Sequence, residues 1–193
     1  MCIRDRRVAI LARNSYHYII CMYGTVLAGG VAVPLNMGKN WDEIQYELDL
    51  VEPVCVLQDG EYLQWEPALA DVYSAKLEPM DAFTAFAPAQ DVKEVEDLAA
   101  MAFIMFTSGT TGRSKAVMLA ERNFFTVMQM HVAMGDHLLD FKHRQLPEDK
   151  NDVLSNFAIL PLFHLGTFIC LFVWACKGWA LNLSCLLYTS PSP

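Results

Sequence analysis

FTSGTTGRSKAV, residues 106–117, is a stretch rich in glycine and hydroxyl side chains that also holds an arginine and a lysine. Gly109 and Gly112 permit positive φ angles, which let neighbouring backbone amides converge on an anion. The stretch also holds four hydroxyl side chains, at Thr107, Ser108, Thr110 and Thr111. Lys115, helped by Arg113, supplies positive charge. This combination of donors predicts a turn that binds a polyphosphate.

The spacing of the turn excludes a Walker A phosphate loop, in which a Lys directly follows the second Gly. Here Lys115 comes three residues after Gly112. The runs 102–106 and 116–119 on either side are apolar and of strand length, so we expect the turn to join two strands. An ordinary polar turn is the alternative. The six residues TSGTTG, however, recur by chance about once in ten million positions.

Three stretches resemble the adenylate-forming superfamily, which includes acyl-CoA synthetases, luciferases and the adenylation domains of peptide synthetases. The turn at 106–117 resembles the signature loop of that superfamily, and ILPLFHLG at 159–166 resembles its next core motif. Residues 7–36 resemble the segment that opens its nucleotide-binding domain. The likeness is greatest to a fatty acyl-CoA synthetase. The resemblance implies an α/β fold with layers of parallel sheet and helices packed on them. It also implies that this chain is an incomplete part of the large N-terminal domain of such an enzyme.

The resemblance also implies an activity. In such an AMP-forming acid–thiol ligase, ATP activates a carboxylic acid, here expected to be a fatty acid, to an acyl-adenylate and then an acyl-CoA thioester. The implied small molecules are the carboxylate substrate, ATP, Mg²⁺ and coenzyme A, with the metal ligands mostly outside this chain and none assigned in it. The residues implied to bind the phosphates are Thr107, Ser108, Gly109, Thr110, Thr111, Gly112 and Lys115.

Two side chains are the candidate catalytic residues. Lys115 is implied to hold the departing phosphates, and His164 is implied to line the acyl pocket near the carboxylate, which a neutral imidazole can contact as a hydrogen-bond donor. A core histidine bonded to backbone is the alternative for His164. The turn departs from the commonest family form at two positions, with Ser114 in place of Pro and Ala116 in place of Gly. Neither change removes a donor or a charge.

Two other functions stay open. The first is an adenylation domain that loads an amino or aryl acid onto a carrier protein. The second is a non-catalytic membrane or scaffold protein, because residues 157–176 are long enough to span a bilayer and hold no acidic or basic residue apart from His164. Pro161 and Gly166 interrupt that run, which favours a buried strand end and a short helix over 165–176.

Composition narrows the partners and the compartment. The 14 basic and 22 acidic residues give a net charge of −8, so nucleic acid is not expected to bind, whereas peripheral membrane contact stays open. The six cysteines form no CxxC pair, which is typical of reduced thiols in a cytoplasmic protein. The histidines at 131, 137 and 143 recur at a spacing that scatters them around a helix, which argues against a metal site.

Both ends of the chain differ from the rest. Residues 1–6 and 184–193 resemble translated sequencing-adapter sequence and are excluded from the fold. The remaining 7–183 is interpreted as a partial nucleotide-binding domain. It lacks the adenine, ribose and hinge motifs and the C-terminal lysine that the resemblance implies. We therefore expect the chain to be inactive alone.

Hydrophobic periodicity predicts the order of elements. Strands at 7–11, 31–35 and 54–58 alternate with a helix at 16–28, capped by Ser15, and a helix that Asn40 opens, which favours a parallel sheet. Residues 60–97 are expected to be a surface connection with one short helix. We expect Asn123 to cap a helix with an apolar face, followed by a loop at 143–152 and a strand at 153–160. The residues assigned to that face are Phe125, Met128, Val132 and Leu139.

Overall fold

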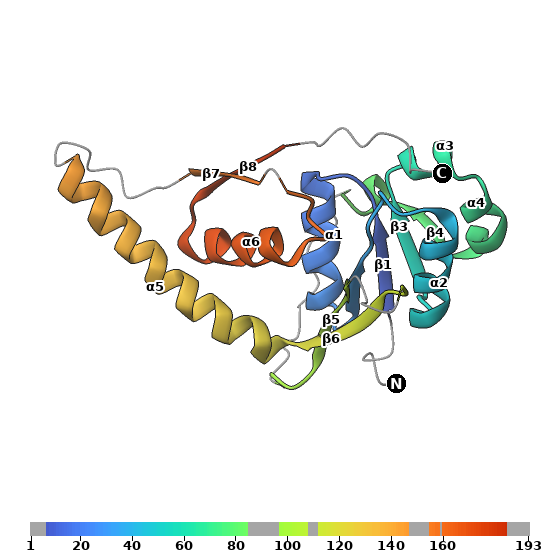
Figure 1. The fold of residues 1–193 in the computed structure, drawn as a ribbon, viewed down its shortest axis with the longest axis horizontal. Coiled ribbons are helices and arrows are strands. Elements are labelled where there is room, and N and C mark those ends of the chain that lie inside the picture. Colours follow the sequence, from blue (N-terminus) through green and yellow to red (C-terminus); the bar gives the residue numbers. More distant parts are fainter. Residues whose placement is uncertain (1–6, 85–96, 108–111, 147–154, 159, 185–193) are drawn as a thin grey trace.

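The computed structural model describes residues 7–84, 97–107, 112–146, 155–158 and 160–184. Within these residues the chain forms two sheets with helices packed around them (Figure 1). The larger sheet has six strands in the order β4-β3-β1-β2-β5-β6, and its neighbouring strands run parallel except for β5 and β6. The smaller sheet pairs β7 with β8 in parallel.

The elements have the following bounds. The strands are β1 (Arg7–Leu11), β2 (Val31–Pro34), β3 (Cys55–Gln58), β4 (Leu77–Pro79), β5 (Met101–Thr107), β6 (Lys115–Ala120), β7 (Ser155–Ala158) and β8 (Ala180–Leu183). The helices are α1 (Tyr16–Leu27), α2 (Trp41–Val51), α3 (Glu61–Trp65), α4 (Ala68–Tyr73), α5 (Glu121–Gln145) and α6 (Leu165–Lys177), with short 3₁₀ helices η2 (Ser74–Lys76) and η3 (Met80–Thr84). The predicted α/β class, with a mostly parallel sheet and packed helices, is confirmed.

The two predicted helix caps are present. Ser15 accepts a hydrogen bond from the Tyr18 backbone N–H at 3.1 Å and so begins α1. Asn40 accepts from the Glu43 backbone N–H at 3.0 Å, and the Glu43 carboxylate accepts from the Asn40 backbone N–H at 3.3 Å, which completes a capping box for α2. Local sequence therefore determines where both helices begin.

The larger sheet has a hydrophobic core on each face. Along β1, Ala9 and Leu11 belong to the core that α2 and α4 cover, whereas Ile10 belongs to the core under α1. Side chains of successive strand residues point to opposite faces, which produces this division. Figure 1 shows the result, with α1 on one side of β1 and α2 to α4 on the other. A sheet covered on both faces is typical of parallel α/β folds.

The interpretation of 60–97 as a surface connection with one short helix was wrong for the described part of that segment. It contains α3, α4, η2, η3 and the edge strand β4, in which Leu77 pairs with Val56 of β3. Three residues are too few to show strand periodicity. Pro79 at the end of β4 is compatible with an edge position because an edge strand needs fewer backbone donors.

Helix α5 also differs from the prediction. It begins at Glu121, and Asn123 lies inside its first turn, where its Oδ1 accepts from the Ala120 backbone N–H at 2.8 Å. The helix continues to Gln145, so the first residues of the predicted 143–152 loop are helical. Phe124 is the buried aromatic residue, with its ring centroid 4.7 Å from that of Phe103, whereas Phe125 is exposed.

The apolar segment near the C-terminal end forms two short elements. Ser155–Ala158 is strand β7, within the predicted 153–160, of which 153, 154 and 159 lie outside the described residues, and α6 begins at Leu165 as expected. No helix among the described residues is both long and apolar enough to cross a bilayer.

Candidate functional site

The predicted phosphate-binding turn joins the antiparallel strands β5 and β6. Thr107, the last residue of β5, pairs with Lys115, the first residue of β6. The prediction that the turn joins strand to strand is therefore confirmed. Gly112 has φ = +91°, a value that side chains with a Cβ rarely adopt. The predicted donors Ser108, Gly109, Thr110 and Thr111 lie outside the described residues.

A pocket of about 530 Å³ lies beside this turn, and we call it the turn pocket. Its wall combines the carboxyl ends of two parallel strands, where Asn36 follows β2 and Thr107 ends β5, with Gly112 and Ser114 from the turn. His164, the N-terminal cap of α6, also lines this pocket. In α/β proteins, ligands bind outside the carboxyl ends of parallel strands. His164 thus lines the same cavity as Thr107 and Gly112, although it is distant from them in sequence.

Lys115 is placed differently. It is exposed and does not line the turn pocket. Val117 and Leu119, two and four residues further along β6, do line it. Because alternate residues of a strand share a face, Lys115 lies on the pocket side of β6, at the rim of the cavity.

His164 is exposed and forms the N-terminal cap of α6. Its Nδ1 accepts a hydrogen bond from the Gly166 backbone N–H at 3.3 Å. A neutral imidazole whose Nδ1 accepts carries its proton on Nε2, so Nε2 is the nitrogen that can donate to a ligand. The geometry is that of a cap at a pocket wall and not that of a buried core histidine.

Asn14 holds the segment that leads into α6. Its side-chain Nδ2 donates to the backbone oxygens of Leu160, at 3.0 Å, and Ser184, at 3.2 Å. Its Oδ1 accepts from the Leu162 backbone N–H at 2.8 Å. Asn14 is buried, with 7% of its surface exposed, and follows β1 by three residues. One side chain therefore connects the larger sheet to the segment that carries His164.

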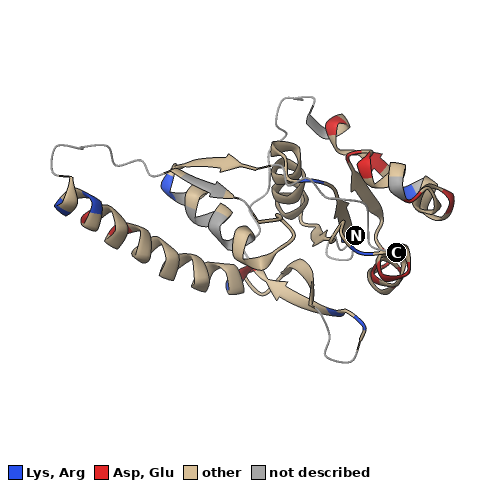
Figure 2. Ribbon diagram, turned by 45° about the horizontal axis from the view of Figure 1, so that its top comes forward, with Lys and Arg blue, Asp and Glu red and all other residues tan. Residues whose placement is uncertain are grey.

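An ion pair between a partly buried lysine and a buried glutamate lies beside the turn. The Lys39 ammonium contacts the Glu47 carboxylate, and it also lies 2.7 Å from the Ser114 hydroxyl oxygen. Glu47 is fully buried in α2, and Lys39 lines the turn pocket. Arg113 stacks over the Tyr46 ring of the same helix, with its guanidinium carbon 5.1 Å from the ring centroid. Figure 2 shows basic positions beside the turn and acidic positions on the helices α2 to α4.

The sequence interpretation missed Lys39 and Glu47. The signal for Glu47 was its position, because it shares the buried face of α2 with Ile44 and Leu48, three residues before it and one after. A carboxylate on a buried helix face needs a compensating charge. Nothing local identifies Lys39 as that charge, since the two residues meet only when the turn before α2 folds back.

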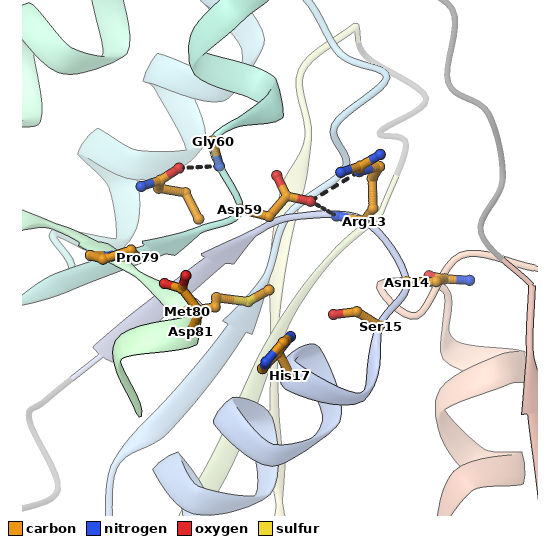
Figure 3. Close-up of a pocket in the computed structure, with 10 residues that line it drawn as sticks. Arg13, Asn14, Ser15, His17, Asp59, Gly60, Pro79, Met80 and Asp81 are labelled. Atoms are coloured by element: carbon orange, nitrogen blue, oxygen red, sulfur yellow. Dashed lines mark hydrogen bonds and ion pairs between the residues drawn. The ribbon is translucent and has the colours of Figure 1, made fainter. Parts of the chain in front are cut away.

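A second pocket, of about 470 Å³, lies at the carboxyl ends of β1, β3 and β4 (Figure 3). Asp59 accepts from the backbone N–H and from Nε of Arg13, at 3.0 and 3.1 Å. Gln58 accepts from the Gly60 backbone N–H, and Ser15 caps α1. The Arg13–Asp59 contacts join the ends of β1 and β3, whereas Gln58 and Ser15 bond to backbone within their own segments, and we assign no ligand to this pocket.

The thiols and the histidines of the described residues provide no further site. No group of three or more His, Cys, Asp or Glu among those residues is arranged to hold a metal ion. Cys55 is half-buried, and burial, reinforced by the nearby Glu78 and then Cys21, raises its pKa to about 11. The Cys55 thiol therefore stays protonated at neutral pH, which makes it a poor nucleophile.

Comparison with known proteins places these features in a family context. The sequence profile of the AMP-binding enzyme family matches residues 3–185. Tyrocidine synthase 3 of Brevibacillus parabrevis is 32% identical over 128 residues, which are 65% of this chain and 2% of the synthase. The 2-succinylbenzoate–CoA ligase of Bacillus cereus strain AH820 is 28% identical over 165 residues, which are 84% of this chain and 30% of the ligase. This chain therefore spans less than a third of either relative.

A solved structure shows the same fold. The o-succinylbenzoate coenzyme A synthetase of Bacillus subtilis, in complex with ATP and magnesium ion, superposes with a TM-score of 0.70 at 21% identity. The match covers 93% of this chain and 44% of the synthetase. The arrangement of strands and helices is thus that of the N-terminal part of an adenylate-forming enzyme.

Proposed function

This chain belongs to the AMP-binding enzyme family, and from that premise we propose that it is the phosphate-binding part of a longer enzyme that activates a carboxylic acid with ATP. In this reaction the carboxylate attacks the α-phosphate, pyrophosphate leaves, and the acyl-adenylate passes its acyl group to a thiol. Within this proposal the thiol is coenzyme A and the acid is a fatty acid.

One observation carries the proposal. The turn pocket combines two residues of the predicted phosphate-binding turn, Thr107 and Gly112, with His164 from the start of α6. A phosphate group and the carboxylate it activates must meet in one cavity, and this pocket has donors for both. Its volume of about 530 Å³ is within the range of small-molecule sites.

The residues of the turn are suited to the departure of pyrophosphate. Negative charge accumulates on the β- and γ-phosphates as the bond to the α-phosphate breaks. Donors that are fixed in place beforehand stabilise this charge more in the transition state than in the ground state. We assign that role to the Thr107 hydroxyl, to the backbone N–H groups near Gly112 and to the Lys115 ammonium. We assign the carboxylate contact to Nε2–H of His164.

The described residues do not fit a magnesium ion. Mg²⁺ prefers carboxylate oxygens and water, and Glu43 is the acidic residue among those that line the turn pocket. The Glu43 carboxylate is engaged in the capping box of α2. We therefore assign no magnesium ligand in this chain and attribute no step to one.

Pyrophosphate exchange in the full-length enzyme tests the proposal. The enzyme is incubated with ATP, labelled pyrophosphate and one acid at a time from fatty, aryl and amino acid panels. Acid-dependent formation of labelled ATP, with fatty acids preferred, is the expected result. If no acid supports exchange while the enzyme is folded, the proposed activity is wrong.

A second function has one observation in its favour. The likeness to tyrocidine synthase 3, at 32% identity, is to a peptide synthetase and not to a CoA ligase. An adenylation domain that loads an amino or aryl acid onto a carrier protein would use the same turn and the same first step. Preference for amino or aryl acids, followed by transfer to a carrier protein and not to coenzyme A, would favour this alternative.

A further inference from the structure

Lys39 connects helix α2 to the turn through its side chain. Its ammonium lies 2.7 Å from the Ser114 hydroxyl oxygen and 5.9 Å from the centroid of the Phe106 ring. Phe106 lies in β5, on the N-terminal side of the two glycines of the turn, and Ser114 lies on their C-terminal side. The Lys39 ammonium is therefore near residues on both sides of the glycines of the turn.

The position of Lys39 is determined by a buried charge. Glu47 is completely buried, and its Oε1 contacts the Lys39 ammonium. Its other oxygen, Oε2, is buried and has no hydrogen-bond partner among the described residues. A buried carboxylate without a compensating cation is strongly unfavourable. The Lys39 ammonium is thus held at one place before any ligand binds, and Ser114 is the hydroxyl that it contacts there.

A contact that fixes Ser114 also restricts its neighbours in the turn. Ser114 separates Gly112 and Arg113 from Lys115, the residue that we assign to the departing phosphates. Glycine allows many backbone conformations, and serine does not restrict φ as proline would. The hydrogen bond from the Lys39 ammonium to the Ser114 hydroxyl instead restricts the backbone at Ser114 through its side chain.

Arg113 strengthens the connection to α2. Its guanidinium lies over the ring of Tyr46, which is adjacent in sequence to Glu47. Two consecutive residues that follow Gly112 therefore contact other parts of the chain. Arg113 contacts Tyr46 of α2, and Ser114 contacts Lys39 in the segment just before α2. The stack on Tyr46 is at the surface, whereas the Lys39 contact is anchored by the buried Glu47.

We propose that Lys39 is a positioning residue, which, held by Glu47, fixes Ser114 and thereby presents the backbone N–H groups around Gly112 and the Lys115 side chain to the phosphates of ATP. The proposal rests on the proposed function, because it gives this tether a role in ATP binding. Lys39 acts through Ser114 and not by direct contact with the reacting atoms.

Three variants of the full-length enzyme separate the tether from the charge. Ser114→Ala removes the hydroxyl, and Ser114→Thr retains it as the conservative control. The double variant Lys39→Met/Glu47→Leu removes both charges of the ion pair together, which leaves no uncompensated buried carboxylate and preserves the fold. For each variant, the KM for ATP and kcat of pyrophosphate exchange are measured. The melting temperature and the amide hydrogen exchange of Gly112, Arg113 and Lys115 without nucleotide are measured as well.

The expected result is that Ser114→Ala and the double variant raise the KM for ATP roughly three- to tenfold and speed exchange at the three amides. Their melting temperatures stay close to that of the wild type, and Ser114→Thr behaves like the wild type. If Ser114→Ala leaves KM and amide exchange unchanged, the proposal is overturned. An impaired double variant beside a normal Ser114→Ala would also overturn it, because Lys39 would then act on ATP directly.

The two proposals can fail separately. If pyrophosphate exchange is absent with every acid, the proposed function fails, and the role of Lys39 in ATP binding fails with it. If exchange is present and depends on Lys115, but faster amide exchange in Ser114→Ala is not accompanied by a higher KM, the proposed function stands. The tether is then a structural contact only, and the positioning role is wrong.

Discussion

Thr107 lies directly opposite Lys115 in the antiparallel ladder of β5 and β6. Residues paired in this way have Cα atoms about 4.5–5.5 Å apart and side chains on the same face of the sheet. Thr107 lines the turn pocket, so its partner Lys115 is held at the rim of the same cavity. The ladder thus sets the separation of the two ends of the turn, which is the basis for assigning both residues to one phosphate site.

Replacement of Lys115 by Ala in the full-length enzyme removes the charge without disturbing the core, because the residue is exposed. We expect kcat for pyrophosphate exchange to fall by roughly a factor of 100, the size of effect seen when one preorganised donor is lost. The melting temperature is expected to stay unchanged. Lys76→Ala, on η2 and outside the turn pocket, is the matched control and should retain full activity.

Gly112→Ala tests the backbone conformation of the turn. Its φ of +91° is strained for any residue with a Cβ, although no heavy atom lies within 4 Å of the Cβ that the change adds. The expected cost is therefore conformational, about 1 to 2 kcal/mol of unfolding free energy, with weaker ATP binding.

Gly24→Ala is the matched control for that change. Gly24 lies in α1, and its added Cβ also meets no atom within 4 Å. Because the helical conformation suits alanine, this change should stabilise the protein by about 0.5 to 1 kcal/mol. Urea unfolding of both variants measures the difference, and equal effects of the two changes would show that the backbone at Gly112 is not strained.

Much of the fold could be predicted because its signals are local. Ser15 and Asn40 each bond to a backbone N–H three residues further on, where their helices begin, and strand β2 between the two helices is apolar throughout. Strand β4 could not be predicted, because three residues show no periodicity and only pairing with β3 makes Leu77 part of a strand. The start of α5 was misplaced because an asparagine inside the first turn can bond to the backbone as a cap does.

The candidate site shows the same division. The glycine-rich turn and His164 were predicted from motifs that are contiguous in sequence, and His164 lines the turn pocket together with described residues of the turn such as Thr107 and Gly112. The contact of Lys39 with Ser114 joins residues 75 positions apart, and it depends on a buried Glu47 that no local pattern pairs with it. Contacts of this kind between side chains distant in sequence are determined by packing, which one sequence does not reveal.

Two variants separate the structural and chemical roles of His164. Asparagine is a favoured N-terminal cap, so His164→Asn should preserve the start of α6 and the melting temperature while it removes Nε2–H. We expect lower activity with a higher KM for the acid. His164→Ala should lose the cap as well and destabilise the protein by about 1 kcal/mol. If His164→Asn is fully active, the imidazole has no role in binding the carboxylate.

Asn14→Ala tests the connection between the larger sheet and the segment before α6. The change removes the partner of three backbone groups, those of Leu160, Leu162 and Ser184. Unfolding free energy should fall by about 2 to 4 kcal/mol, since buried polar groups lose their hydrogen bonds. Asn123→Ala, at an exposed asparagine, should cost at most about 1 kcal/mol. A similar cost for both would contradict the bridging role of Asn14.

The location of the triphosphate tests the central claim most directly. We predict that a crystal structure of the full-length enzyme with ATP and magnesium will place the β- and γ-phosphates at the β5–β6 turn. The phosphate oxygens should lie within hydrogen-bond distance of Lys115 and of the backbone N–H groups near Gly112. Phosphates bound at the second pocket, beside Arg13 and Asp81, or at any other place away from the turn would contradict the account.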